Sequence, residues 1–348
     1  MKILFVSNST THDYNKTPII GRPSAWNFLP YYLKKQDADV EVLGVGKYEL
    51  YKTYFMYLKF KPDLIITTWI PACFVPIFLK KIGLIKCPII HRWEDYYEEM
   101  MTNYPRLLTG FMERFSAKNA DYIITVLKTN EEKAKKMNKQ VFLLPFGLIA
   151  GLGKTKINLD KLKTKRSNLK VIYSGTQEEW KRVDKIINAA KKVDCDLFLI
   201  GDTNPKLKAL AEGYKNIHFM GYLPSNELLS ILKQGDILVN TANHDMCMKF
   251  IDYIAAGKVI LAYDGRSNNF LKNRENAYLT KDFTEGLKEL IKNKELRKKL
   301  GNNVKKIKLY THEEVADIHL KLYKKILAGD KNLKEFEKSY FHIQYLDD

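Results

Sequence analysis

The strongest constraint on the fold is an alternation of short apolar runs with longer segments of helical periodicity. In the first half the runs are ILFV, VEVLGV, DLIITT, CPIIHR, DYIITV and VFLLP, at 3–6, 40–45, 63–68, 87–92, 121–126 and 141–145. Such runs are typical of strands buried on both faces of a parallel sheet, with helices as crossovers. The sequence therefore predicts an α/β fold.

A second series follows a segment at 147–168, rich in Gly and Lys, that lacks apolar periodicity. Its five runs lie at 171–175, 196–201, 217–221, 236–241 and 259–264. We expect two doubly wound, Rossmann-like domains, 1–150 and 169–310, joined by a linker at 151–168. Ligands of such sheets bind beyond the carboxyl ends of the strands, so a cleft between the domains is the expected site.

The segment 311–348 begins with a helix signal. Thr311 is followed three residues later by Glu314, the pattern of a capping box, and the next residues have helical apolar spacing. We expect a closing helix and tail that pack back on the N-terminal domain.

The charge of the chain favours anionic partners. Its 348 residues include 58 Lys and Arg against 40 Asp and Glu, a net charge of +18. Through Arg166 the counts are 27 and 15, so the first part carries +12 and the remainder +6. Nucleotides, phospholipid surfaces and nucleic acids all fit this excess. A lysine-rich proteome is the alternative explanation, because only nine of the 58 are Arg.

The four cysteines are too widely spaced for a CxxC metal or redox motif, and we expect reduced thiols in a cytoplasmic protein. The N-terminal apolar run of four residues is too short for a secretory signal. The longest uncharged stretch, 64–79, has 16 residues, whereas a membrane helix needs about 20. We therefore expect no transmembrane segment.

The most informative motif is DMCMKFIDYIAAGKVILAYD at 245–264. It resembles the nucleotide-sugar site of family 4 retaining glycosyltransferases of the GT-B fold, with a Glu, then K-x-x-E-Y-M-A-x-G-K-P-V, then a strand ending in Asp. The resemblance implies that Asp252 binds the ribose hydroxyls and that Asp245 lies beside the donor sugar. The carboxylates are seven residues apart where the family has eight, and His244 occupies the eight-residue position.

A second motif, SGTQEEWKRVDKIINAA at 174–190, is similar to the family pattern G-R-x-x-x-x-K-G-x-D-x-L-I-x-A. Lys181 aligns with the lysine that neutralises the diphosphate. Thr176 stands where the family has a second basic residue, and Lys249 and Arg182 are the candidates to replace that charge. The remaining donor-side candidates lie at or just after the ends of predicted strands: Gly175, Gly201, Tyr222 and Leu223. The resemblance implies that Tyr222 and Leu223 frame the base through backbone atoms.

Weaker matches lie in the first domain. Gly21 is the candidate loop glycine before the first helix, where a bare backbone lets acceptor or phosphate approach. The stretch CPIIHRWEDYYEE resembles P-V-V-x-T-x-H-D, with Glu94 at the histidine position and Asp95 at the aspartate. We expect His91 to substitute from three residues upstream, which makes these three residues the acceptor-side candidates.

The resemblance implies a glycosyltransferase that moves a sugar from a nucleotide diphosphate sugar to the hydroxyl of a glycan or lipid-linked acceptor, with retention. We expect no metal and no cofactor, with catalysis by Asp245, Lys181 and Lys249. Two alternatives stay open. One is a DNA-modifying GT-B glucosyltransferase, for which the positive charge would supply phosphate contacts; nucleic acid is otherwise not an expected partner. The other is a degenerate GT-B protein that binds a nucleotide or a membrane without activity.

The segment SAWNFLPYYLKK at 24–35 combines aromatic residues with Lys34 and Lys35, a composition suited to an anionic lipid interface. It predicts peripheral contact with the inner membrane face through the first domain. The alternative is that the same spacing buries one helix face in the core of the domain.

Overall fold

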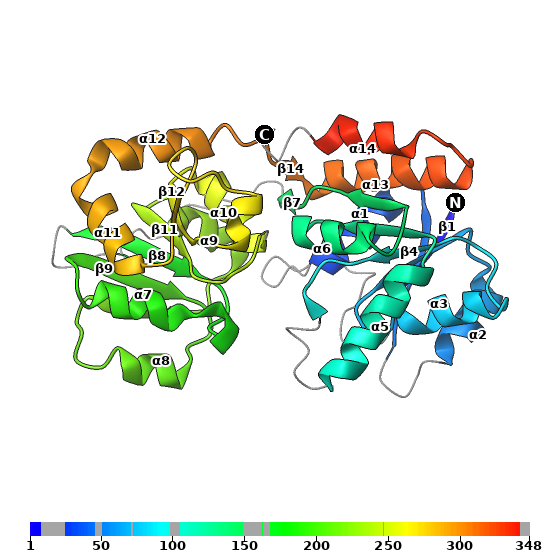
Figure 1. Cartoon of the computed structure of the whole chain (residues 1–348), viewed down its shortest axis with the longest axis horizontal. Helices are drawn as coiled ribbons and strands as arrows, with labels where there is room; N and C mark the ends of the chain where they lie inside the picture. The colour runs from blue at the N-terminus through cyan, green and yellow to red at the C-terminus, as the bar shows by residue number, and fades with distance from the viewer. Residues whose placement is uncertain are drawn as a thin grey trace. The chain divides into compact units, whose positions relative to one another are not determined.

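The computed structural model describes residues 1–7, 25–45, 51–70, 72–97, 105–148, 162, 168–245 and 247–341. The chain divides into two compact units (Figure 1). The N-terminal unit holds the described residues up to Gly147 and those from Tyr310 onward, and the C-terminal unit holds those of Leu148–Leu309.

The N-terminal unit is built on a six-stranded sheet in the order β2-β1-β3-β4-β5-β6, with every adjacent pair parallel. Most of its residues are fully buried, as continuous apolar runs require. The strands are β1 (Lys2–Ser7), β2 (Asp39–Gly44), β3 (Leu64–Thr68), β4 (Ile89–Arg92), β5 (Tyr122–Thr125) and β6 (Val141–Leu143).

The strand order places the helices of this unit in two layers. Across the sheet, β2 lies on one side of β1, whereas β3 to β6 follow one another on the other side. Because crossover connections are right-handed, this reversal of direction puts α1 on one face of the sheet and α2, α3 and α5 on the other. The returning helix α13 packs on α1, where Phe28 stacks on His312 with ring centroids 4.1 Å apart. The helices are α1 (Ala25–Lys35), α2 (Lys52–Phe60), α3 (Phe74–Lys81), α5 (Arg106–Asn119), α6 (Lys128–Lys135), α13 (His312–Leu327) and α14 (Leu333–Phe341).

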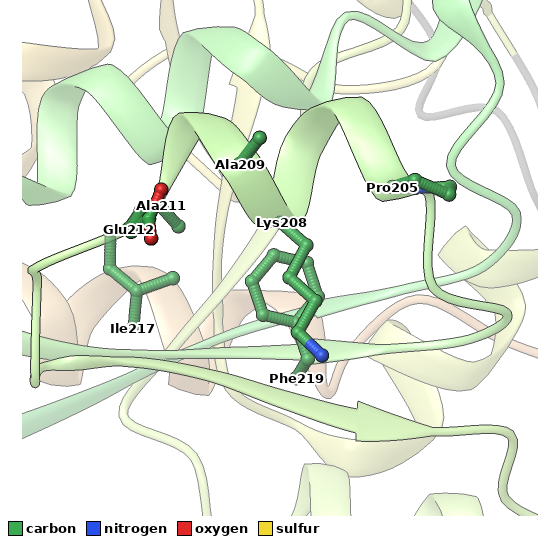
Figure 2. A pocket seen from close by; sticks show the side chains of 7 residues that line it. All are labelled: Pro205, Lys208, Ala209, Ala211, Glu212, Ile217 and Phe219. Atoms are coloured by element: carbon green, nitrogen blue, oxygen red, sulfur yellow. The ribbon is translucent and has the colours of Figure 1, made fainter.

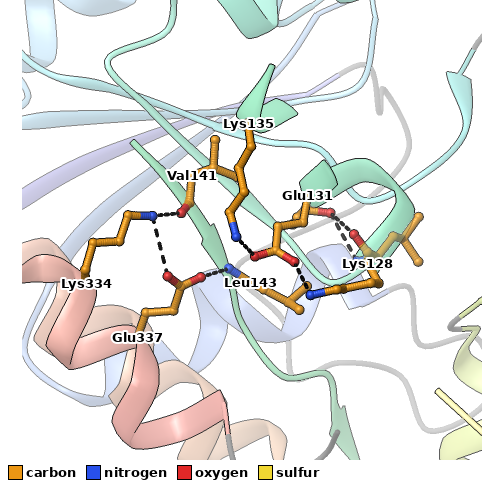
Figure 3. A network of polar contacts seen from close by, with 9 residues as sticks. Lys128, Glu131, Lys135, Val141, Leu143, Lys334 and Glu337 are labelled. Atoms are coloured by element: carbon orange, nitrogen blue, oxygen red, sulfur yellow. Dashed lines mark hydrogen bonds and ion pairs between the residues drawn. The ribbon is translucent and has the colours of Figure 1, made fainter. Parts of the chain in front are cut away.

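Helix α14 covers the edge strand β6 (Figure 3). The Glu337 carboxylate accepts a hydrogen bond from the Leu143 N–H at 2.6 Å, and the Lys334 ammonium donates to the Val141 carbonyl at 2.5 Å. On the neighbouring helix α6, Glu131 forms ion pairs with Lys128 and Lys135. Side chains of α14 therefore occupy backbone groups that an open sheet edge would leave unpaired.

The C-terminal unit repeats the architecture, with the parallel order β10-β9-β8-β11-β12-β13. Its strands are β8 (Leu169–Ser174), β9 (Cys195–Ile200), β10 (Ile217–Gly221), β11 (Ile237–Asn240), β12 (Val259–Tyr263) and β13 (Tyr278–Thr280). Its helices are α7 (Val183–Ala190), α8 (Pro205–Leu210), α9 (Ser225–Leu232), α10 (Met248–Ala256), α11 (Phe283–Lys292) and α12 (Lys294–Val304), with 3-10 turns η2 (Glu179–Lys181) and η3 (Arg266–Asn269). A small sheet pairs β7 (Gly147–Leu148) with β14 (Tyr310–Thr311).

These two sheets confirm the predicted α/β class with two Rossmann-like domains. Each predicted apolar run contains a strand, and the capping box of Thr311 and Glu314 is formed at the start of α13. Strand β13 was not predicted, because three residues are too few for a recognisable pattern. Helix α14 also escaped prediction.

Candidate functional site

Three neighbouring strands of the C-terminal unit end in glycines with positive φ. Gly175 follows β8 with φ of 125°, Gly201 follows β9 with φ of 136°, and Gly221 ends β10 with φ of 68°. A Cβ on Gly201 would lie 2.2 Å from the Gly175 carbonyl oxygen, so no larger residue fits without moving backbone. The positions directly after β8 and β9 therefore carry no side chain. Both lie at the carboxyl edge of the sheet, where ligands of open α/β folds bind.

The Lys249 ammonium lies directly beside this edge. Lys249 is in the first turn of α10 and only 8% exposed, and its Nζ is 3.9 Å from the centre of the Tyr173 ring. A Cβ on Gly175 would meet that Nζ at 3.4 Å. Among the described residues Nζ has no hydrogen-bond acceptor. Burial, together with the charge of Lys181, lowers the pKa of Lys249 to about 7.

Two further cations come from the turn before α7. The Lys181 ammonium lies 3.5 Å from the centre of the Trp180 ring, and the Arg182 guanidinium lies 4.2 Å from that of Tyr263. Arg182 has a left-handed backbone, with φ of 56°, at the junction of η2 and α7. The Lys181 carbonyl accepts a hydrogen bond from Thr241 Oγ1 at 2.5 Å, which ties this turn to the end of β11.

His244 and Asp245 lie between β11 and α10 and are almost wholly buried. Burial, followed by the charges of Lys181, Arg266 and Lys249, lowers the pKa of His244 to about 4, and Asp245 partly opposes this. The Nδ1 atom of His244 is 3.8 Å from Asp245 Oδ1, beyond hydrogen-bond range. The imidazole is therefore neutral at pH 7.

Asp252 lies one helical turn after Lys249 on α10 and is partly buried. Burial raises the pKa of its carboxyl to about 7. The next residue, Tyr253, donates to the Val239 carbonyl at 3.0 Å and accepts from the Ser174 N–H at 3.0 Å. The Tyr253 hydroxyl thus fixes α10 against the ends of β8 and β11, which holds Lys249 and Asp252 in place.

The other donor-side candidates are at the surface of the same unit. Thr176 is exposed and donates through Oγ1 to the Glu178 carboxylate at 3.1 Å. Tyr222 is exposed and Leu223 partly exposed, in the loop after β10. The structure thus brings Gly175, Lys181 and Lys249 together.

The acceptor-side candidates of the N-terminal unit are mostly inside it. His91 is fully buried in β4, with Nδ1 3.3 Å from Thr67 Oγ1, and burial lowers its pKa to about 4. Glu94 is buried and forms an ion pair with Arg92, whereas Asp95 is partly exposed. Gly21 lies outside the described residues.

The aromatic segment at 24–35 contributes to the core. Phe28, Leu29 and Leu33 are buried in the unit, while Tyr31 and Tyr32 are partly exposed, with Lys35 over both rings. Phe28 and Leu33 are therefore not available to a lipid surface. Among the described residues, no helix has the length and apolar character needed to cross a membrane.

A separate pocket of about 420 Å³ lies at the sheet edge, between α8 and β10 (Figure 2). Its wall is largely apolar, with Phe219 and Ile217 beneath and Lys208 and Glu212 at the side. None of the predicted site residues lines it. In the described part of the chain, no three His, Cys, Asp or Glu side chains gather in a way that could hold a metal ion.

Two aromatic residues of the site were not predicted. Tyr173 is the face on which Lys249 rests, and Tyr253 is the hydrogen-bonded anchor of α10. Tyr173 lies in a buried strand, where an aromatic residue indicates core. Its position next to the last residue of β8, two residues before Gly175, was the available signal, because side chains near the carboxyl end of a strand border the ligand edge.

Two parallel, doubly wound sheets with a cationic site at the carboxyl edge of the second define the GT-B class of fold. Residues 154–307 match the family model described as "Glycosyl transferases group 1". This match supports a glycosyltransferase. No match is found among curated proteins.

Solved structures agree on the fold. Sucrose-phosphate synthase from Thermosynechococcus elongatus is 16% identical with a TM-score of 0.74, covering 94% of this chain and 99% of that one. HepE from Anabaena, in complex with UDP-glucose, is 14% identical with a TM-score of 0.71, covering 93% and 99%. A glycosyltransferase from Rickettsia africae is 13% identical with a TM-score of 0.68, covering 95% and 98%.

Proposed function

We propose that this protein transfers a sugar from a nucleotide diphosphate sugar to an acceptor hydroxyl, with retention and without a metal ion. The observation that carries the proposal is the Lys249 ammonium, buried at the edge of the sheet with no hydrogen-bond acceptor among the described residues. A buried ammonium is costly unless an anion compensates it. A bound diphosphate is the anion that this site would take.

The surroundings of Lys249 suit a diphosphate. Lys181 adds a second positive charge close enough to lower the pKa of Lys249, and Lys249 itself lies in the first turn of α10, the end of a helix that carries partial positive charge. The bare turn at Gly175 lets phosphate oxygens approach the backbone. Fixed cations and helix dipoles stabilise the charge that develops on a leaving diphosphate, and in this proposal they do so in place of a metal.

In the same proposal Asp252 accepts hydrogen bonds from the ribose hydroxyls, and Tyr222 and Leu223 frame the base. Asp245 and His244 lie on the sugar side. The leaving phosphate helps to deprotonate the acceptor hydroxyl in a front-side attack, so no strong protein base is needed. His91, buried and with a lowered pKa, is not required for this step. The acceptor is a glycan or a lipid-linked sugar.

The test is a thermal-shift screen of UDP-, GDP-, ADP- and dTDP-sugars, with UDP-glucose first because HepE was solved with it. A ligand at 100 times its Kd stabilises the folded state by about 2.7 kcal/mol, a readily measured shift. Lys181→Ala should weaken binding of the nucleoside diphosphate far more than binding of the nucleoside. Equal losses for both would remove Lys181 from the phosphate site.

Activity separates the proposal from its rivals. Slow release of the nucleoside diphosphate from the bound sugar nucleotide, and the anomeric configuration of the product, test transfer and retention. Binding without release would favour a degenerate protein that only binds nucleotides. Duplex DNA binding that weakens steeply with salt, with a glucosylated DNA product, would favour the DNA-modifying alternative.

A further inference from the structure

Exposed large apolar side chains are concentrated on one part of the N-terminal unit. Twelve such residues are found in the described chain, and nine of them belong to α2, α3, α5 and the residues that adjoin these helices. Leu107 is 87% exposed and Phe55 66% exposed. The nine are Tyr51, Phe55, Leu58, Phe78, Ile82, Leu84, Leu107, Leu108 and Phe111. Together with the exposed basic residues of the same segments, which are named below, they make up what we call the α2-α3-α5 surface.

These side chains belong to one continuous helix layer. Helix α3 packs against both α2 and α5, and the three lie side by side in Figure 1. The Phe74 ring joins α3 to α5, with centroid distances of 6.0 Å to Phe78 and 6.3 Å to Phe111. On α2, Tyr51, Phe55 and Leu58 have the spacing of one helix face, and that face points to solvent. The exposed residues therefore form a surface and are not scattered.

The charge of this layer is almost entirely positive. The segments 51–61, 74–86 and 105–119 contain nine Lys and Arg and one acidic residue, Glu113. Glu113 is buried and forms an ion pair with Lys133, so it contributes no free negative charge. The exposed basic residues are Lys59, Lys61, Lys81, Lys86, Arg106, Arg114 and Lys118. An apolar surface whose own helices expose only basic charges is complementary to a layer with an apolar interior and anionic head groups.

We propose that the α2-α3-α5 surface binds the face of an anionic lipid bilayer. The opposite layer of the unit is already covered, because α13 packs on α1 and buries Phe28 against His312. Binding through α2, α3 and α5 therefore replaces the predicted contact through 24–35. It does not depend on glycosyl transfer, because all the residues involved lie outside the Lys249 site.

The test is sedimentation of the full-length protein with vesicles of phosphatidylcholine alone or mixed with phosphatidylglycerol. We expect binding to the mixed vesicles at low salt and release as salt rises. Phe55→Ala, Leu107→Ala and Phe111→Ala together should lower the partition coefficient by at least about tenfold, equivalent to about 1.4 kcal/mol. Lys59→Gln should lower it by about fivefold, because each basic contact contributes about 1 kcal/mol.

Matched controls come from exposed residues elsewhere. Leu327→Ala on α13 removes an exposed apolar side chain, and Lys298→Gln on α12 removes an exposed charge. Both should bind like the wild type, and circular dichroism should show all variants folded. Vesicle binding that the triple substitution leaves unchanged would place the contact on another surface and overturn the proposal. Concentration-dependent dimerisation lost in the triple variant, without vesicle binding, would overturn it in favour of a second copy of the chain.

Discussion

The two units have the same six-stranded parallel sheet but treat buried charge in opposite ways. At the end of β4 in the N-terminal unit, the buried Arg92 guanidinium is paired with Glu94. At the corresponding edge of the C-terminal unit, the buried Lys249 ammonium faces an aromatic ring and no acceptor among the described residues. One charge is compensated within the fold, whereas the other has no compensating acceptor among the described residues, and in the proposed function a bound diphosphate would supply it.

In the proposed function, this difference assigns the binding of the anion to the C-terminal unit. A paired buried charge is part of the structure, and removing one partner leaves the other uncompensated. A buried charge without a partner destabilises the free protein and gains its compensation from a ligand. Substitutions at the two sites should therefore have opposite effects on stability.

The largest effect is expected for Glu94→Gln in the N-terminal unit. It leaves Arg92 without its carboxylate in a buried position, which should lower the free energy of unfolding by about 3–5 kcal/mol. Urea denaturation followed by tryptophan fluorescence measures this, because the adjacent Trp93 is fully buried. Glu285→Gln breaks the exposed pair with Lys288 and should change stability by no more than about 1 kcal/mol. Equal effects of the two substitutions would contradict the contrast between the units.

Lys249→Met should have the opposite sign. Removing the buried ammonium should raise the melting temperature of the unliganded protein while weakening nucleoside diphosphate binding. The loss should be about 2–5 kcal/mol, at least about thirtyfold in Kd, as for truncation of one member of a buried charge pair. Thermal shift and calorimetry measure the two quantities, and Lys298→Met is the exposed control. A destabilised Lys249→Met variant would show that the ammonium is structural.

The pH dependence of nucleoside diphosphate binding provides a further test of the role of the Lys249 charge. The pKa of Lys249 is lowered to about 7, and a bound diphosphate would raise it again. Binding above pH 7 must therefore take up a proton, so the affinity should fall by up to about tenfold per pH unit as pH rises from 7. Titration calorimetry of the nucleoside diphosphate across pH 6–9 should show this fall in the wild type and not in Lys249→Met. The same slope in both would assign the proton to another group.

The sequence predicted the strands because parallel strands buried on both faces leave continuous apolar runs. It did not predict β13 (Tyr278–Thr280), where three residues leave no pattern, or α14, whose packing depends on Lys334 and Glu337 contacting β6 about 190 residues away. Helices and strands were thus predictable where the sequence pattern is local. They were not predictable where contacts between residues distant in sequence determine the structure.

The candidate site was predictable only in part for the same reason. Lys249, Lys181 and Asp252 were found through the motifs, but the lack of an acceptor for Lys249 depends on Tyr173 and Gly175, over seventy residues earlier. Apolar spacing also cannot separate an inward from an outward helix face. For the aromatic segment at 24–35 the spacing left membrane contact and core burial both open, and in the structure Phe28 and Leu33 are buried, whereas Phe55 and Leu107 on other helices are exposed.

The smallest effect is expected for Asp252→Asn. The amide keeps the size of the carboxyl but accepts hydrogen bonds from ribose less strongly, so affinity for a ribonucleotide should fall by about fivefold. The 2′,3′-dideoxy analogue has no hydroxyls for this group, and its affinity should hardly change. Calorimetry with both ligands provides the measurement, and an unchanged ribonucleotide affinity would remove Asp252 from the ribose site.

The pH dependence of stability provides an independent test of the role of Asp252. Because burial raises the pKa of Asp252 to about 7, the folded state holds a proton that the unfolded chain, with an ordinary pKa near 3.8, has released. The wild type should therefore lose this contribution to stability as pH rises from about 4 to 7, and Asp252→Asn should not. The variant should be the more stable of the two at pH 8, with the difference disappearing toward pH 4. A variant that is less stable at pH 8 would mean that the carboxylate is held by contacts of its own, as a structural group of α10.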